Sequence, residues 1–180
     1  MRQRTGLHAL LRSLGGAAAV EFGLVLPFLM VLCFGVIEVG RLLFHYHTVE
    51  KSVEDAVRFL ARTPGPLDCD DVNTWKTRSF GSETVESAAQ NLAIYGQYSP
   101  PGGTEPLLYY WTDPSSVTIS VTCVDNPVSG NLPRYRYPGN ARVPTIHVSA
   151  QISYVPIIAA FIVGNSLSFT SIAQARFIGE

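Results

Sequence analysis

The most prominent pattern in the chain is a long apolar run near its N-terminus. Residues 22–37, FGLVLPFLMVLCFGVI, carry no charge and lie between two acidic residues, Glu21 and Glu38. The wider window 15–40 exceeds the roughly 20 residues that a helix needs to cross about 30 Å of hydrocarbon. We therefore predict a transmembrane helix with its core at residues 22–37.

Beyond this span the apolar residues continue with helical spacing. They recur every three or four positions, and the charged residues fall off the stripe that they form. The stripe consists of Leu42, Leu43, Tyr46, Val49, Val53, Ala56, Val57 and Leu60. Thr63 and Pro64 end the pattern. We predict one unbroken helix over residues 17–62, whose second half is amphipathic and packs on the head or on other subunits.

Residues 63–180 predict an α+β head. Ser82 is a candidate N-cap for a second helix that runs to about Tyr95 and ends at Gly96. The expected apolar face of that helix is Val85, Ala88, Ala89 and Leu92. Alternation of apolar and polar residues predicts strands at 117–124, 145–154 and 167–177. The expected fold class is therefore α+β, with a long N-terminal helix and a small antiparallel sheet that is covered by helix on one face.

Two segments between the predicted strands differ from the rest. Residues 125–144 are predicted to form a loop, and its Arg134, Tyr135, Arg136 and Tyr137 favour a solvated surface over a nucleic-acid contact. Residues 155–163, VPIIAAFIV, are uncharged but too short to cross a bilayer as a helix. They form either a buried turn between the last two strands or a surface that touches the membrane or a partner.

Composition and charge narrow the class of protein. Charged residues make up 15% of the chain and the mean hydropathy is +0.18, which agrees with a membrane segment and excludes intrinsic disorder. A formal net charge of −1 leaves no basic excess for a nucleic-acid partner. Arg2, Arg4 and Arg12 precede the span without an acidic residue. The positive-inside rule therefore places the N-terminus in the cytoplasm and the head outside it.

The basic N-terminal segment could also belong to an ordinary signal peptide, but the cleavage pattern does not fit. Signal peptidase requires small residues after the apolar run. Here the small residues at 15–19 precede the run, and Glu38 and Arg41 follow it. Any cleavage is therefore expected in front of the span.

Residues 16–22, GAAAVEF, resemble the processing site of type IV prepilins of the Flp/Tad class. The resemblance implies that a membrane aspartyl peptidase cuts between Gly16 and Ala17, after which Glu21 and Phe22 are the fifth and sixth mature residues. The longer stretch 16–44 is similar to the N-terminus of TadE-family proteins, the pilin-like minor components of tight-adherence pilus machinery. Residues 88–96 and 173–176 also resemble that family, with less specificity. Residues 1–16 would then be a leader.

The resemblance implies a TadE-like minor pilin or pseudopilin, a structural and assembly component of a Tad (Flp) pilus for adhesion and surface colonisation. The implied partners are a prepilin peptidase, other pilins and minor pilins, inner-membrane Tad assembly components and the lipid bilayer. The protein would cross the inner membrane once with its head in the periplasm, and it could enter an extracellular pilus. The alternative is an unprocessed single-pass anchor that displays a periplasmic binding or regulatory domain.

Glu21 lies at the edge of the apolar helix, where a carboxylate needs a partner. A charge at the bilayer centre costs roughly 2.5–3.5 kcal/mol on insertion scales. The resemblance implies that the partner is the amine released at Ala17, on the same or a neighbouring subunit. Alternatively, Glu21 lies at the interface beside the positive N-terminus of the helix.

The three cysteines fall in two environments. Cys33 lies inside the span and behaves as a small apolar residue. Cys69 and Cys123 fall in the exported part, where oxidising conditions favour a disulfide, although spacing alone does not prove it. The sequence predicts no metal site, because His45 and His47 are two residues apart and do not share a helical face.

The sequence carries no motif of an enzyme. It lacks G-x-S-x-G, H-E-x-x-H, the P-loop and G-x-G-x-x-G. The expectation is a protein that is not an enzyme, with no catalytic residue and no cofactor.

Overall fold

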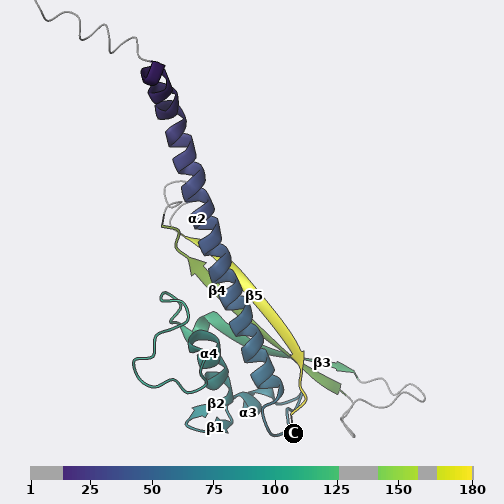
Figure 1. Cartoon of the computed structure of the whole chain (residues 1–180). Helices are drawn as coiled ribbons and strands as arrows, with labels where there is room; N and C mark the ends of the chain where they lie inside the picture. The colour runs from purple at the N-terminus through teal and green to yellow at the C-terminus, as the bar shows by residue number, and fades with distance from the viewer. Residues whose placement is uncertain (1–13, 126–141, 158–165, 180) are drawn as a thin grey trace, which may run out of the picture.

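A single long helix dominates the computed structural model, which describes residues 14–125, 142–157 and 166–179 (Figure 1). This helix, α2, spans Leu14–Ala61 without a break over 48 residues. At 1.5 Å per residue it is about 72 Å long. The head gathers around its C-terminal half, and its N-terminal half extends away from the head. The predicted α+β class, a long N-terminal apolar helix followed by a small antiparallel sheet, is confirmed.

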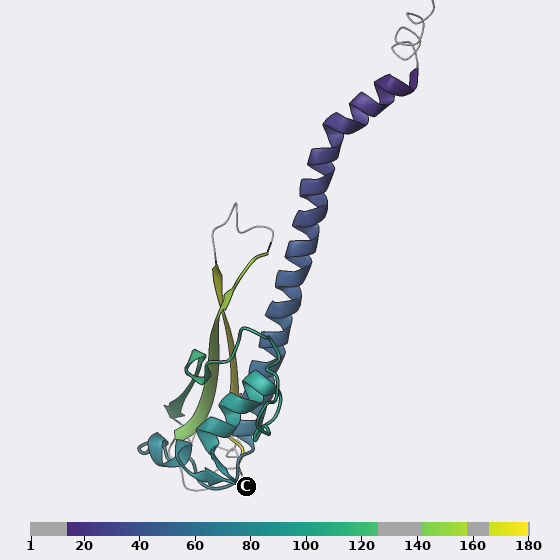
Figure 2. The same ribbon diagram turned by 90° about the vertical axis from the view of Figure 1, so that its left-hand side faces the viewer.

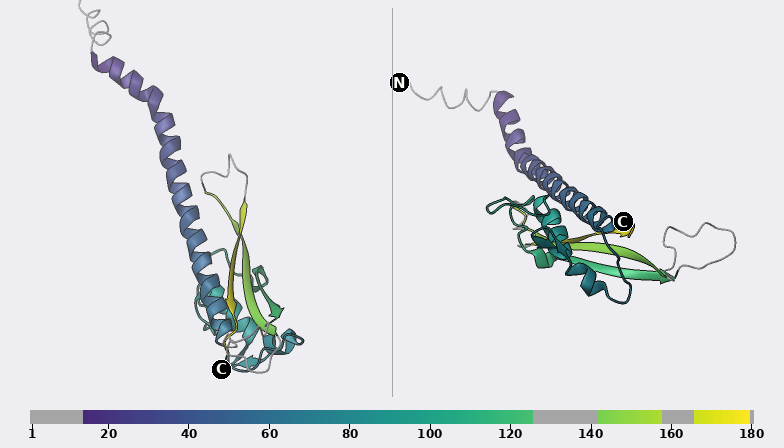
Figure 3. Two further views of the ribbon diagram at one scale, coloured as in Figure 1. Left: turned by 90° about the vertical axis from the view of Figure 1, so that its right-hand side faces the viewer. Right: turned by 90° about the horizontal axis from the view of Figure 1, so that it is seen from below.

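The sheet of the head has three antiparallel strands in the order β3-β4-β5. They are β3, Val117–Asp125; β4, Arg142–Tyr154; and β5, Leu167–Arg176. Val148 of β4 lies opposite Ile119 of β3 and Ala173 of β5, so apolar residues of all three strands share one face. Figure 3 shows the strands on one side of α2, with that helix against their inner face. The ends of β3 and β5 lie within one residue of the predicted bounds, and β4 begins at Arg142 instead of residue 145.

The core of the head lies between α2 and the inner face of the sheet. The helix contributes Val49, Val53, Ala56, Val57 and Leu60, all of them buried as the helical stripe predicts. Leu43 of the predicted stripe does not pack on the head and is exposed in the single chain, whereas His45 is buried. At this level the helix meets the head through polar contacts, described below, and through aromatic contacts such as that of Tyr46 with Phe169.

The second predicted helix is α4, Val85–Tyr95, which packs against α2. Gly96 ends it with a φ of 71°, a left-handed conformation that glycine adopts without strain. The N-cap is Thr84 and not Ser82: the Thr84 hydroxyl oxygen accepts a hydrogen bond from the Ser87 backbone N–H at 3.1 Å. Ser82 instead lies in the turn between two short strands, so it is unavailable as a cap.

The buried face of α4 also differs from the prediction at its C-terminal end. Val85, Ala88 and Ala89 are buried as expected, but Leu92 is only half-buried. Ala93 and Ile94 are buried in addition. At its C-terminal end, the buried face of α4 is therefore centred on Ala93 and Ile94 and not on Leu92.

Four short elements have no counterpart among the predictions. They are α3, Val72–Lys76; β1, Ser79–Phe80; β2, Glu83–Thr84; and the 3-10 turn η1, Pro114–Ser116. Asp71 caps α3 and Asp113 caps η1 through their side chains. Elements of two to five residues are too short to show a helical or alternating period, which is why the pattern did not reveal them.

Three predicted features lie wholly or partly outside the described residues: the leader at 1–13, the loop at 126–141 and residues 158–163 of the uncharged run. The described beginning of that run does not form a buried turn. Val155 and Ile157 are both exposed, although Pro156 between them is buried.

Candidate functional site

The four residues predicted for processing all lie on α2. Gly16, Ala17, Glu21 and Phe22 are exposed to solvent. Ala17 and Glu21 are four residues apart, so their side chains lie on the same face of the helix. An amine released at Ala17 would therefore lie one turn from the Glu21 carboxylate of its own chain. Because α2 begins at Leu14, the Gly16–Ala17 bond belongs to helical backbone, so cleavage there would require the first turn to unwind.

The apolar half of α2 is exposed along its full length. Every residue from 16 to 37 is exposed, and the helix is long and apolar enough to cross a membrane once. Pro27 lies inside this half. Proline removes one helical hydrogen bond and clashes with the carbonyl four residues earlier, which bends a helix. Figure 2 shows α2 bending in its N-terminal part.

At the end of the apolar run, α2 carries a carboxylate that is buried against the head. Glu38 is 7% exposed, although it directly follows the uncharged segment. Its Oε1 accepts a hydrogen bond from the Tyr154 hydroxyl at 2.5 Å and another from the Ile157 backbone N–H at 3.2 Å. Tyr154 is the last residue of β4, so the end of this strand is fastened to α2 (Figure 2).

Further polar groups of α2 extend this contact toward the head. The Arg41 guanidinium lies 3.9 Å from Glu38 Oε1, and its central carbon lies 5.6 Å from the centre of the Tyr154 ring. One turn on, His45 Nδ1 lies 2.9 Å from the Tyr110 hydroxyl, and the His45 ring packs edge-on against Tyr154. We call these five residues, Glu38, Arg41, His45, Tyr110 and Tyr154, the junction cluster.

The sequence indicates the α2 members of the junction cluster, but it does not indicate their partners in the head. Glu38, Arg41 and His45 are spaced by three and four residues, which places them on one helical face. A carboxylate at the end of an apolar span needs a partner there as much as Glu21 does at its start. The partner comes from Tyr154, 116 residues further along the chain, and no local pattern identifies so distant a residue.

Burial and hydrogen bonding alter the chemistry of the two tyrosines in the junction cluster. Burial, followed by the hydrogen bond to Glu38, raises the pKa of Tyr154 from its ordinary value of 10.0 to about 12. Burial is also the main cause that raises the pKa of Tyr110 to about 12. Both phenols therefore keep their protons to a higher pH than an exposed tyrosine does.

These shifts predict an alkaline loss of stability. Between pH 10 and about 12 the unfolded chain loses the tyrosine protons that the folded chain retains, so stability falls as the pH rises through this window. Tyr154→Phe should weaken this dependence, because one of the two phenols is then absent. Urea unfolding midpoints measured below pH 10 and within the window test this. An equal pH dependence in the wild type and the variant would contradict it.

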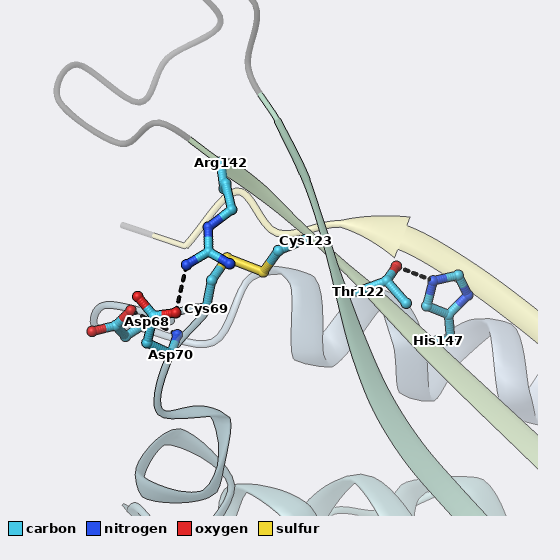
Figure 4. The surroundings of a disulfide bond; sticks show 7 residues. All are labelled: Asp68, Cys69, Asp70, Thr122, Cys123, Arg142 and His147. Atoms are coloured by element: carbon cyan, nitrogen blue, oxygen red, sulfur yellow. Dashed lines mark hydrogen bonds and ion pairs between the residues drawn. A yellow bond between two sulfur atoms is a disulfide. The ribbon is translucent and has the colours of Figure 1, made fainter.

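A disulfide joins Cys69 and Cys123 at the opposite end of the head, with their Cα atoms 6.0 Å apart (Figure 4). Cys69 lies in the loop after α2, and Cys123 lies near the end of β3. The neighbouring Asp70 forms an ion pair with Arg142, the first residue of β4. The loop after α2 is therefore fastened to both β3 and β4. Cys33 is not part of a disulfide and is exposed on the apolar half of α2.

Comparison with protein families identifies the N-terminal helix. Residues 16–58 match the family model described as TadE-like protein. This helix is TadE-like. The resemblance of the N-terminal sequence to the TadE family is thereby confirmed over these residues. No curated protein and no solved structure matches the chain.

The TadE-like segment coincides with one structural element. It begins at Gly16, two residues after the start of α2, and ends at Arg58, before α2 ends at Ala61. The segment therefore covers both the exposed apolar half of the helix and the half that packs in the head. The helix is long and apolar enough to span a membrane, which is consistent with membrane anchoring, and its TadE-like sequence suggests a component associated with Tad pilus machinery.

Proposed function

We propose that this chain is a TadE-like minor pilin or pseudopilin of a Tad (Flp) pilus, with a structural and not a catalytic role. A prepilin peptidase would process it between Gly16 and Ala17, α2 would hold it in the inner membrane, and its head would lie in the periplasm. The observation that carries the proposal is the coincidence of the TadE-like match with α2, starting at Gly16.

The exposure of α2 supports this proposal. No described part of the head covers the helix between residues 16 and 37, so its apolar side chains need lipid or other helices around them. Lipid tails are about as apolar as leucine, so exchanging lipid for the helices of neighbouring subunits costs little hydrophobic energy. The same surface can therefore serve a membrane anchor and a packed fibre. Other pilins, minor pilins and inner-membrane Tad components are the partners that this surface would meet.

The position of Glu21 supports an assembly role as well. Its carboxylate is exposed at the beginning of the apolar half and lies on the same face as Ala17. A neighbouring subunit that buries this face must supply a cation, and the amine of a cleaved Ala17 provides one. Processing and assembly would then be linked, because only the cleaved chain carries that amine.

The test is the N-terminus of the mature protein. The full chain is expressed with and without an active cognate prepilin peptidase, and the membrane-purified product is analysed by intact mass. We expect the wild type to begin at Ala17 when the peptidase is present, and Gly16→Lys to keep its original start. Gly23→Ala is the control, because a Cβ at Gly23 meets nothing within 4 Å and the change lies outside the predicted processing motif.

An uncleaved wild type in the presence of an active cognate peptidase would refute the pilin proposal. The protein would then be an unprocessed single-pass anchor, and its function would have to be sought in the head.

A further inference from the structure

The surface of α2 is two-sided just beyond the predicted span. Glu38, Arg41 and His45 face the head, as members of the junction cluster. The rest of the circumference is apolar and exposed at Val39, Leu43 and Phe44. The exposed apolar surface of the helix thus continues from the span to Phe44, where it is still 67% exposed.

This asymmetry bears on the depth at which the head would lie relative to a bilayer. Phe44 lies six residues after Glu38, which corresponds to about 9 Å along the helix axis. A bilayer that covers Phe44 therefore extends past the level of Glu38. The residues that hydrogen-bond to Glu38 then lie at or below the depth of the membrane interface and not in the aqueous space above it.

The part of the head at this depth has the character of a lipid contact. Ile157 donates its backbone N–H to Glu38, and its own side chain is 65% exposed. Val155 is exposed beside it. The sequence carries no charge from Val155 to Val163. Exposed aliphatic side chains at the edge of a hydrocarbon layer gain free energy by entering it, at about 25 cal/mol per Å² of apolar surface removed from water.

We propose that residues 155–157, after β4, are a second membrane contact of this protein, inserted into the interface of the same leaflet from which α2 emerges. The occupant of this surface is lipid. The covalent link to the span supports this choice, because α2 brings the surface to the bilayer in every membrane-anchored copy of the protein. The contact also shields Glu38 and Arg41 from hydrocarbon on the side that faces the head.

The proposal rests on the membrane anchoring contained in the proposed function, and the experiment separates the two. Ile157→Cys is made in a Cys33→Ser background, labelled with an environment-sensitive fluorophore and reconstituted as the full chain into vesicles of phosphatidylcholine and phosphatidylglycerol. Quenching by aqueous iodide is compared with quenching by lipids that carry a spin label near the headgroup. Ile172→Cys in the same background is the matched control.

Ile172 suits this control because it is 68% exposed, nearly as much as Ile157. It lines a surface depression with Glu54 of α2. Glu54 lies 16 residues after Glu38, or about 24 Å further from the span. We expect iodide to quench the label at Ile157 several-fold less than the label at Ile172, and the lipid quencher to act in the reverse order.

Equal iodide quenching at the two positions would overturn the proposal. Protection at Ile157 from both quenchers would also overturn it, since a protein partner and not lipid would then cover the surface. A Val155→Cys variant, measured in the same way, guards against a local effect of the change at Ile157. Unchanged tryptophan emission shows that the labelled variants are folded.

The native Cys33, labelled in the wild type, reports on the anchor itself. Protection of Cys33 together with exposure of Ile157 refutes the second contact and leaves the membrane anchoring intact. Exposure of Cys33 to iodide refutes the anchoring, and the second contact fails with it.

Discussion

Replacing Cys69 and Cys123 with serine should lower the free energy of unfolding of the head by about 4 kcal/mol. The disulfide joins residues 54 positions apart, and on the chain-entropy description a crosslink of that length restricts the unfolded chain by about this amount. The head is small, so a crosslink is a large share of the roughly 5–15 kcal/mol that stabilises an ordinary domain.

Urea unfolding in detergent micelles measures this loss. Trp75 and Trp111 are 1% and 2% exposed and both lie in the head, so their fluorescence follows its unfolding. Cys33→Ser is the control, because Cys33 is exposed and not part of a disulfide. The control should keep the wild-type midpoint. A double serine variant that unfolds at the wild-type urea concentration would show that the disulfide does not stabilise the head.

Glu38→Ala should be the most damaging single change in the junction cluster. It removes the acceptor of the Tyr154 hydroxyl and of the Ile157 N–H, and it leaves Arg41 without its nearest carboxylate. Removing one partner of a buried ion pair costs roughly 3–5 kcal/mol. Because Arg41 is partly exposed, we expect a loss of about 3 kcal/mol, at the lower end of that range.

A double-mutant cycle shows whether the stability lost in Glu38→Ala comes from the hydrogen bond with Tyr154. Tyr154→Phe alone should lower the free energy of unfolding by about 2 kcal/mol, a value within the range for a hydrogen bond to a charged group. Added to Glu38→Ala, it should cost clearly less, because the bond is already absent. Glu50→Ala on the same helix is the matched control: Glu50 is exposed and its contact with His47 is a surface pair, so its loss should stay within about 0.5 kcal/mol.

Hydrogen exchange locates the effect of Glu38→Ala. The amide of Ile157 should exchange faster in this variant, since its acceptor is gone, whereas amides in the centre of β4 should keep their protection. Uniform acceleration across β4 would mean that Glu38 supports the whole sheet and not this junction in particular.

The elements with a long repeating pattern could be predicted from the sequence. The helical period through Val49, Val53 and Leu60 defined the buried face of α2, and the alternation in β3 and β5 defined the inner face of the sheet. Thr84 shows where such reasoning fails. Two hydroxyl residues two positions apart are equivalent caps in sequence, and the short strand pair β1–β2 decided between them.

The candidate site also has a part that the sequence predicts and a part that it does not. The residues expected at the processing position, Gly16, Ala17, Glu21 and Phe22, lie within seven consecutive residues and belong to one motif, so the sequence alone predicts them together, and their role stays a prediction. The junction cluster could not be predicted, because its members come from α2, from the segment before η1 and from the end of β4. Only the folded chain brings these three segments together.

Because α2 is one continuous helix over Leu14–Ala61, no flexible hinge separates its apolar half from the half that packs in the head. Ala61 lies 24 positions after Ile37, or about 36 Å along the helix axis, and the head packs along this part of the helix. Membrane helices tilt by about 20° on average, which displaces the far end of such a lever sideways by about 12 Å. A thinner bilayer increases the tilt of a long span. If α2 spans a membrane as proposed, the thickness of the bilayer would therefore determine where the disulfide end of the head is presented to its surroundings.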